Sequence, residues 1–195
     1  MGTVMHDDAV LPRLEDGPVV LRAVRPQDRV DRIEAGLDRE FLRGLAGDER
    51  TACSRLSTAA ADSWYEHQRD GLHWVIEREG RCVGNAGFSY LDSVHQRATY
   101  AIAIFAAAAR GHGIGTAATR LVLRHGFEVL GLHRIDLRVL ETNLRAIRCY
   151  ERCGFVREGI ELETAFVDGR WVNDVRMRLL AHEYDALPPE AGADA

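Results

Sequence analysis

The sequence predicts a single α/β domain built on a mixed sheet. Strand-like and helical segments follow one another in the order strand, helices, three strands, helix, strand, helix and two strands. A glycine-rich loop, "RGHGIG" at 110–115, lies between an apolar strand and a helix. A chain of 195 residues with 46% hydrophobic content can bury a full core as one domain.

The N-terminal half begins with a strand and continues with helices. In "VVLRAVRPQD" (19–28) the apolar run ends at Pro26, where a helix can start. Residues 28–70 are expected to form helices and loops. "WVIEREGRCVGNAGFSY" (74–90) predicts two strands around Glu79-Gly80, because glycine supplies the positive φ angle of a hairpin turn.

The C-terminal half alternates between strands and helices before a final hairpin. "ATYAIAIF" (98–105) is apolar throughout, which is typical of a central strand. Helical spacing at 117–130 and alternation in "RIDLRVL" (134–140) predict a helix and a half-buried strand. The remaining elements are a short helix over 143–153 ended by Gly154, and two long strands joined at Asp168-Gly169.

Composition excludes several classes of function. The net charge is −5 and no block of Lys or Arg stands out, which argues against a nucleic-acid partner. The longest apolar stretch, 100–109, is too short to cross a bilayer, and the first residues lack a signal-peptide pattern. We therefore expect a soluble cytoplasmic protein, monomeric or homodimeric, with flexible ends at 1–17 and 183–195.

The cysteines do not predict a metal site. The four of them form no CxxC pair, and their spacings suit neither zinc nor a disulfide scaffold; they are Cys53, Cys82, Cys149 and Cys153. Small buried thiols in a reducing compartment are the simplest interpretation, so no metal is expected.

The glycine loop has several interpretations. A Walker loop is excluded because no lysine follows the glycines. Gly113, Gly115 and Ala118 match the dinucleotide fingerprint G-x-G-x-x-A, with Asp136 about twenty residues further on. That fingerprint normally stands near the start of several strand–helix repeats, whereas this chain ends in a hairpin. The third interpretation is R-x-x-G-x-G from Arg110, and the fourth is a tight turn without a ligand.

The helix after the next strand has an inward-facing stripe. Ala146, Cys149, Tyr150 and Cys153 follow the spacing of one helical face. Tyr150 therefore points inward, where its hydroxyl needs a hydrogen-bond partner. Taken alone, such a residue is more often a core tyrosine than a catalytic one.

The two motifs together resemble a known family. R-x-x-G-x-G after an apolar strand, followed by N-x-x-A-x-x-x-Y-E-R-x-G-F at 143–155, is similar to the GNAT superfamily of acetyl-CoA-dependent N-acetyltransferases. The resemblance covers about residues 18–182, which we take as the acetyltransferase domain. It implies a single-domain GNAT fold: a mixed, mostly antiparallel sheet of about seven strands flanked by helices. "LRAVRPQD", the Trp64 region and "DVRMRLLAHEY" resemble the RimJ/RimL-like branch, whose members acetylate ribosomal-protein N-termini.

The resemblance implies a role for each motif residue. Backbone N–H groups would hold the coenzyme A pyrophosphate at Arg110, Gly111, His112, Gly113, Ile114, Gly115 and Thr116. The pantetheine arm would lie along Ile102, Ala103 and Ile104, with Asn143 lining its channel, and one strand N–H would bind the thioester oxygen. Tyr150 would protonate the departing thiolate, because a phenol with an ordinary pKa of about 10 stays protonated at neutral pH.

The general base is not identified by the sequence. Many GNAT enzymes have a Glu on the strand before the glycine loop, where Thr99 stands here. Glu77, Asp92, His133 and Glu161 are candidates only by residue type and approximate location. A water chain, or no dedicated base, is an equal alternative.

The acceptor also stays open. The resemblance implies a primary amine, either a protein N-terminus or a small molecule such as an aminoglycoside, a polyamine or an amino acid. Acidic residues around the last hairpin favour a cationic acceptor, although solvated strand edges explain them equally well; they are Glu161, Glu163, Asp168 and Asp174. Two other functions remain: an acetyl-CoA-binding regulatory module without catalysis, and a dinucleotide-binding protein.

Overall fold

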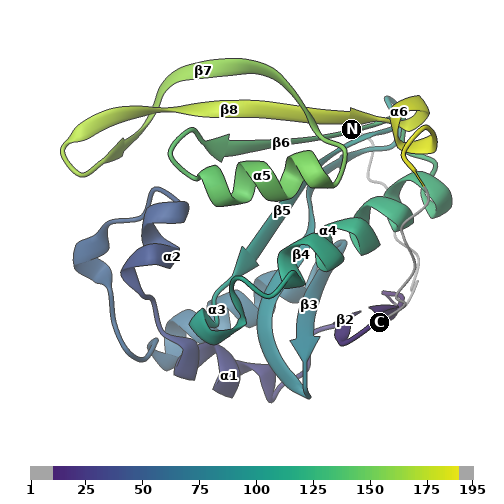
Figure 1. Ribbon diagram of the computed structural model, residues 1–195. Coiled ribbons are helices and arrows are strands. Elements are labelled where there is room, and N and C mark those ends of the chain that lie inside the picture. The colour runs from purple at the N-terminus through teal and green to yellow at the C-terminus, as the bar shows by residue number, and fades with distance from the viewer. Residues whose placement is uncertain (1–10, 189–195) are drawn as a thin grey trace.

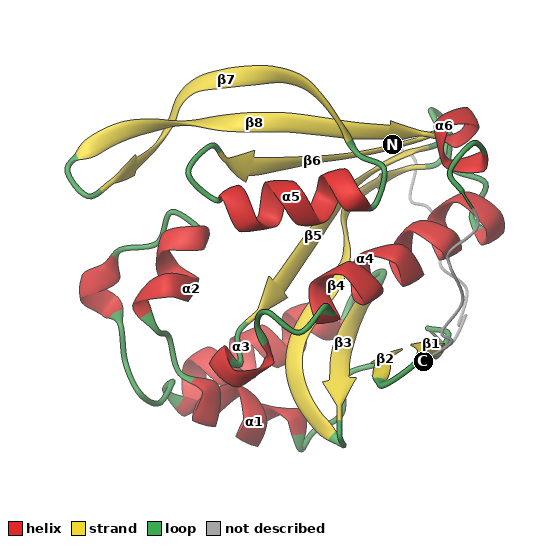
Figure 2. Ribbon diagram, in the orientation of Figure 1, coloured by secondary structure: helices red, strands yellow, loops and turns green. Residues whose placement is uncertain are grey.

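A computed structural model describes residues 11–188 of the chain, which form one mixed sheet with helices on both sides (Figure 2). The sheet has eight strands in the order β1-β2-β3-β4-β5-β6-β8-β7. All neighbouring strands are antiparallel except β5 and β6, which run parallel. This is the mixed α/β sheet that the sequence predicts, and it is mostly antiparallel, as the resemblance implies.

The first five strands form one half of the sheet, and three α-helices and the short 3-10 turn η1 (Glu49–Thr51) lie between β2 and β3. The strands are β1 (Leu14–Asp16), β2 (Val19–Arg22), β3 (His73–Arg78), β4 (Arg81–Asp92) and β5 (Arg97–Ile104). The α-helices are α1 (Asp28–Ala35), α2 (Arg39–Gly44) and α3 (Thr58–Arg69). The short 3-10 turn η2 (Ala107–Ala109) follows β5 in the chain.

The second half contains the remaining strands and the helices that connect them. Its elements are α4 (Ile114–Arg124), β6 (Arg134–Leu140), α5 (Leu144–Arg152), β7 (Val156–Val167), β8 (Arg170–Leu180) and α6 (Ala181–Asp185). Helix α4 continues as a π-helical turn at His125–Val129, so the predicted helix does extend close to Leu130. No helix among residues 11–188 combines the length and the apolar character that a membrane span requires.

The hairpin turns have the backbone that their sequences predict. Glu79 and Gly80 have φ angles of 52° and 76°, and Asp168 and Gly169 have 50° and 78°. Two successive positive φ angles are the mark of the tight hairpin turn for which glycine is preferred. Gly154, after α5, also has a positive φ of 93°.

Strand β1 and helix α6 are elements that the sequence pattern did not predict. Leu14–Asp16 pairs with β2 within the segment that we expected to be flexible. Three residues are too few to display a recognisable alternation. The other expected flexible end begins at 183, but α6 includes residues 183–185, and residues 1–10 and 189–195 lie outside the described part.

The core lies mainly between the sheet and the two helices α4 and α5. Ile114, Ala118 and Leu121 of α4 share one buried cluster with Ile147 and Tyr150 of α5. Helices α1 and α3 contact β4 and β3, where a second small cluster is buried. Helices therefore cover both faces of the β3–β4 region.

The signature "LRAVRPQD" has a structural role. Arg22 donates two hydrogen bonds of 2.8 Å to Asp28, and its Nε donates to Glu77 at 2.5 Å. Arg22 is 4% exposed and Asp28 is 1% exposed. A buried, bidentate ion pair of this kind fixes the start of α1 against β2 and β3.

Candidate active site

The parallel strands β5 and β6 separate after a short paired region. Only Arg97, Ala98 and Thr99 of β5 pair with β6, and the last pair is Thr99 with Asp136. Beyond this point β5 remains paired with β4, while β6 remains paired with β8. The two strands diverge visibly in Figure 1. The edge of β5 from 100 to 104 is therefore free of a β6 partner, as the resemblance implied.

The glycine loop lies at the far end of β5 and leads into α4. Gly111 and Gly113 have φ angles of 88° and 76°, which favour glycine, and α4 begins at Ile114. A Cβ at either glycine would meet no atom within 4 Å, so both face open space. Within the described chain, no hydrogen bond is found for the N–H groups of residues 111–116.

These features fit a phosphate ligand. Six successive N–H groups have no acceptor among residues 11–188, and they lie at the N-terminus of an eleven-residue helix, which makes a site suited to an anion. The run begins at Gly111 and not at Arg110, because the Arg110 N–H donates to the Ala107 carbonyl at 3.1 Å.

The Arg110 side chain points inward and does not lie exposed at the rim of the loop. Its Nε donates to the Ile104 carbonyl and its Nη2 to the Phe105 carbonyl, both at 3.0 Å. Its Nη1 donates to Asp38 at 2.9 Å and to Glu40 at 3.2 Å. The guanidinium thus holds the end of β5 and the start of α2 together, and it occupies the Ile104 carbonyl that we expected to face a ligand.

Tyr150 is buried, as the helical stripe predicts. It is 8% exposed, and its ring lies edge-on to Tyr100 and Phe155 at centroid distances of 6.3 and 5.8 Å. Tyr100 immediately follows the last paired position of β5, so Tyr150 lies close to the separation of the strands. Its hydroxyl has no hydrogen-bond partner within the described chain. Burial raises the pKa of Tyr150 well above the ordinary 10.0.

Asn143 caps α5 and contacts the segment around α2. Its Oδ1 accepts a hydrogen bond from the Ala146 N–H at 3.1 Å, which is the usual role of an N-cap residue. Its Nδ2 donates to the Gly44 carbonyl at 3.3 Å. Both polar atoms of its side chain therefore have protein partners.

Helices α4 and α5 meet through hydroxyl and thiol groups. The Thr116 Oγ1 lies 3.3 Å from the Cys149 Sγ. Hydrogen bonding from Cys153, assisted by Thr116, lowers the pKa of Cys149 from 9.0 to about 6. Cys149 is half-buried rather than fully buried, whereas Cys82 and Cys153 are buried.

Three of the four candidates for a general base are held by other side chains, and the fourth is exposed. Glu77 of β3 pairs with Arg22 of β2, and Glu161 pairs with arginines of β6 and β8. The hydrogen bonds from the backbone and ring of His95 lower the pKa of Asp92 to about 2. His133 is exposed at the corner before β6.

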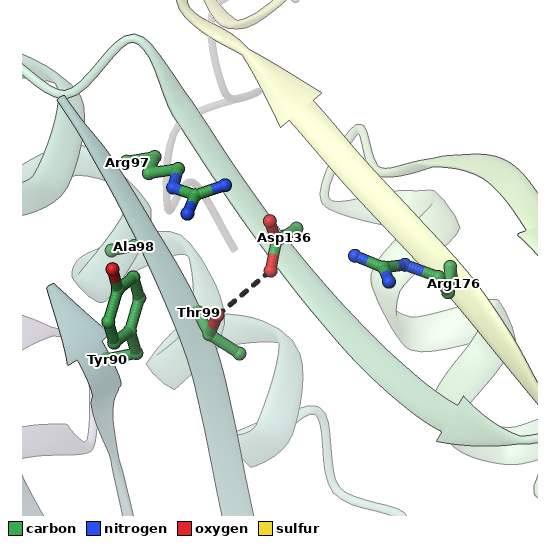
Figure 3. A pocket seen from close by; sticks show the side chains of 6 residues that line it. All are labelled: Tyr90, Arg97, Ala98, Thr99, Asp136 and Arg176. Carbon is green, nitrogen blue, oxygen red and sulfur yellow. Dashed lines mark hydrogen bonds between the residues drawn. The ribbon is translucent and has the colours of Figure 1, made fainter. Parts of the chain in front are cut away.

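A small polar cavity lies at the point where the strands separate, on the sheet face opposite α4 and α5. Its volume is about 210 Å³, and it is lined by Tyr90, Arg97, Ala98, Thr99, Asp136 and Arg176 (Figure 3). The Thr99 Oγ1 donates to the Asp136 Oδ1 at 3.0 Å. Among residues 11–188, no group of three or more His, Cys, Asp and Glu side chains is arranged to hold a metal ion.

Sequence reasoning considered Asp136 only as part of the dinucleotide fingerprint. Thr99 and Asp136 meet because β6 lies beside β5 in the sheet, in a parallel register that the sequence does not reveal. The alternation in "RIDLRVL" places Asp136 on the polar face of its strand, and this pattern is the sequence feature that could have identified Asp136 as a candidate site residue.

Comparisons with known proteins agree with this geometry. The family model described as the acetyltransferase (GNAT) domain matches residues 19–156. The chain is 32% identical over 118 residues to spermidine N(1)-acetyltransferase of Escherichia coli (strain K12). That match covers 60% of this chain and 63% of the relative, so the chain spans less than two thirds of the relative's length. It is also 31% identical over 173 residues to YdaF of Bacillus subtilis (strain 168), named as a presumed ribosomal N-acetyltransferase, covering 86% of this chain and 93% of the relative.

Solved structures share the fold. The spermidine N-acetyltransferase from Vibrio cholerae in complex with CoA and spermine has a TM-score of 0.70 and 26% identity, covering 87% of this chain and 99% of that one. A GCN5-related N-acetyltransferase from Brucella melitensis has a TM-score of 0.75 at 19% identity, covering 92% and 83%. The second likeness concerns the fold alone.

Proposed function

The chain belongs to the GNAT acetyltransferase family, and from that membership we propose that it transfers the acetyl group of acetyl-CoA to a primary amine of a small molecule. The observation that supports this most strongly is the separation of β5 from β6 beside a helix N-terminus whose N–H groups have no acceptor in the described part of the chain. A long, flexible ligand fits this arrangement if its anionic end binds at the helix N-terminus and its hydrogen-bonding arm lies along the free edge of β5.

Each part of the ligand has a counterpart among the residues. The N–H groups of Gly111 to Thr116 would bind the pyrophosphate, favoured by the dipole of α4. The free edge of β5 around Ile102 and Ala103 would bind the amides of the pantetheine arm. When bound, acetyl-CoA supplies an acetyl group activated as a thioester.

Tyr150 is the proposed proton donor. Its hydroxyl is free of hydrogen bonds to the described residues, and its raised pKa keeps it protonated across the neutral range. A buried phenol held by two aromatic rings can give its proton to the departing thiolate without first breaking a hydrogen bond.

A polyamine is the proposed acceptor. The relatives include spermidine N-acetyltransferases, and one crystal structure contains spermine. The net charge of −5 is compatible with a cationic acceptor. A protein N-terminus, as the RimJ/RimL-like resemblance implies, is the competing acceptor.

Calorimetry with three separate ligands tests which coenzyme the protein binds. Acetyl-CoA, NAD and NADP are titrated into the protein, and we expect heat of binding from acetyl-CoA alone. Binding of NAD without a response to acetyl-CoA would overturn the proposal in favour of a dinucleotide-binding protein.

An acceptor screen that detects free CoA thiol tests the reaction. Spermidine, spermine, an aminoglycoside, free amino acids and peptides with ribosomal-type N-termini are compared at equal concentration. The proposal expects the highest kcat/KM with a polyamine. Preference for a peptide N-terminus would replace the polyamine with a protein acceptor.

The regulatory module remains as a second candidate because Thr99 cannot accept a proton at neutral pH. Binding of acetyl-CoA with no transfer to any amine in the screen would support it.

A further inference from the structure

We propose that Asp136 is the general base of the acetyl transfer and replaces the carboxylate that is absent at position 99. The inference rests on the proposed acetyltransferase function. Asp136 lies on β6, directly opposite Thr99 of β5 in the sheet register, and would accept the proton that Thr99 cannot accept.

The position of Asp136 relative to the separated strands supports this role. Asp136 and Thr99 form the last pair before β5 and β6 diverge. Because successive side chains of a strand point to opposite faces, Thr99 and Asp136 lie on the face opposite Tyr100. Tyr150 contacts Tyr100 on the helix-covered face, so the proposed acid and the proposed base approach the gap from opposite sides.

The face occupied by Asp136 is open to an acceptor. The side chain of Asp136 lines the cavity of about 210 Å³ in Figure 3 and is 16% exposed. Ala101, the next residue of β5 on this face, is exposed and has a small side chain. The helix-covered face, by contrast, is filled by the core cluster around Tyr100. An amine therefore has access to the free edge of β5 from the Asp136 side.

The hydrogen bonds of Asp136 leave it able to accept a proton. Oδ1 accepts the hydrogen bond from Thr99, and Oδ2 contacts the Arg134 Nε at 3.2 Å. Each carboxylate oxygen has two lone pairs, so each keeps one for a further partner. Thr99 and Arg134 hold the carboxylate in one orientation and leave part of its acceptor capacity for the amine.

The arginines near the cavity have other carboxylate partners. Arg176 pairs with Glu161, Arg97 contacts Asp92, and Arg134 also pairs with Glu158. Each of these arginines therefore has a carboxylate partner other than Asp136. Among the residues that line the cavity, Asp136 is the one with a carboxylate.

The transfer balances with these two groups. The neutral amine nitrogen forms a bond to the thioester carbon, and the C–S bond breaks with its electron pair going to sulfur. Asp136 takes one proton from that nitrogen, directly or through one water, and Tyr150 gives one proton to the sulfur. The products are the N-acetylated amine and the free thiol of CoA, and both side chains regain their starting state by proton exchange with solvent.

The test combines substitution with chemical rescue. Asp136→Asn should lower kcat by about 10²-fold or more while leaving the acetyl-CoA affinity unchanged. Asp136→Ala should show the same loss, and added formate should restore part of its activity by occupying the vacated space as a carboxylate. A residue that only supports the fold would not respond to formate.

Glu158→Gln is the matched control, because it removes the other carboxylate that contacts Arg134 and leaves the cavity lining intact. It should retain close to the wild-type rate with and without formate. Thr99→Val, which keeps the ion pair between Asp136 and Arg134, should lower kcat moderately without changing the acetyl-CoA affinity, and it tests the same carboxylate if the Asp136 variants fail to fold.

The outcomes separate this inference from the proposed function. A wild-type rate in Asp136→Asn, or an Asp136→Ala variant that formate leaves inactive, would overturn the role of Asp136 while wild-type transfer stands. Absence of acetyl-CoA binding and transfer in the unmodified protein would instead overturn the proposed function and this inference with it.

Discussion

The guanidinium of Arg110 forms an ion pair with the carboxylate of Asp38, although the two residues lie 72 positions apart in the sequence. Asp38 is also the N-cap of α2, accepting a hydrogen bond from the Phe41 N–H at 2.9 Å. One carboxylate thus links the glycine loop to the segment between α1 and α3.

Arg110→Ala should destabilise the protein by about 2 kcal/mol, because two backbone carbonyls and Asp38 lose a shared donor. Affinity for acetyl-CoA should also fall, since the loop is no longer held against β5. Urea unfolding and calorimetry measure the two effects. Arg110→Lys keeps the charge but cannot reach four acceptors, so an unaffected Lys variant would contradict the hydrogen-bonded role.

The same pair predicts a loss of stability in acid. The hydrogen bond from Arg110 lowers the pKa of Asp38 below its ordinary 3.8 in the folded protein. The resulting stabilisation is present above the unfolded-state pKa and is lost as the pH falls through the folded-state value. Urea unfolding of the wild type should therefore weaken more steeply below about pH 4 than that of Arg110→Ala. Parallel curves for the two proteins would contradict the linkage.

Gly113→Ala should weaken both folding and acetyl-CoA binding. The φ angle of 76° costs a residue with a Cβ about 1–2 kcal/mol, and relief of that strain would turn the N–H groups away from the ligand. Gly115→Ala is the control, because its φ is not positive and its Cβ would meet only the Cys149 Sγ at 3.8 Å. Denaturant unfolding and calorimetry should separate the two variants; equal behaviour would refute the conformational argument.

Tyr150→Phe should leave the free energy of unfolding nearly unchanged, because the ring contacts remain and the hydroxyl has no hydrogen bond to the described residues. The rate of acetyl transfer should fall by about 10²–10⁴-fold in kcat. Since burial raises the pKa of Tyr150, the wild-type kcat should show no decline from loss of this proton up to pH 10. A wild-type rate in the Phe variant, with chemistry rate-limiting, would make Tyr150 a core residue only.

Cys149 should react with iodoacetamide more readily than the other cysteines at neutral pH. Its thiol pKa is lowered to about 6, so it is ionised above that value, whereas burial raises the pKa of Cys82. The labelling rate should rise through about pH 6, and acetyl-CoA should slow it, because Cys149 adjoins Thr116 at the proposed phosphate site. Mass spectrometry of digested protein identifies the labelled residue, with Cys149→Ser as the control. Labelling unaffected by acetyl-CoA would argue against that proximity.

Local patterns predicted the backbone of this protein well. The turns at Glu79-Gly80 and Asp168-Gly169 have the expected positive φ angles, and the inward face of α5 does bury Tyr150. Such features depend on residues close together in the sequence, where spacing and glycine content determine the conformation.

Contacts between distant segments were not predictable in the same way. Nothing in the spacing of Arg110 indicates that its partner is Asp38, because the contact exists only once α2 packs beside the glycine loop. The pairing of Thr99 with Asp136 likewise depends on the parallel register of β5 and β6. The roles assigned to the loop, to β5 and to Tyr150 came from resemblance to a family, and the binding and rate measurements described above test them.

The short register between β5 and β6 divides the backbone hydrogen bonding of the sheet into two groups of strands. Opening of the three-residue junction would free only the β6 N–H groups that face β5, because those that face β8 keep their partners. A ligand that forms hydrogen bonds with the β5 edge and with α4, and that packs beside α5, would contact both groups, β1 to β5 and β6 to β8. Acetyl-CoA would then connect the backbones of two groups of strands that share one buried core but only three paired positions.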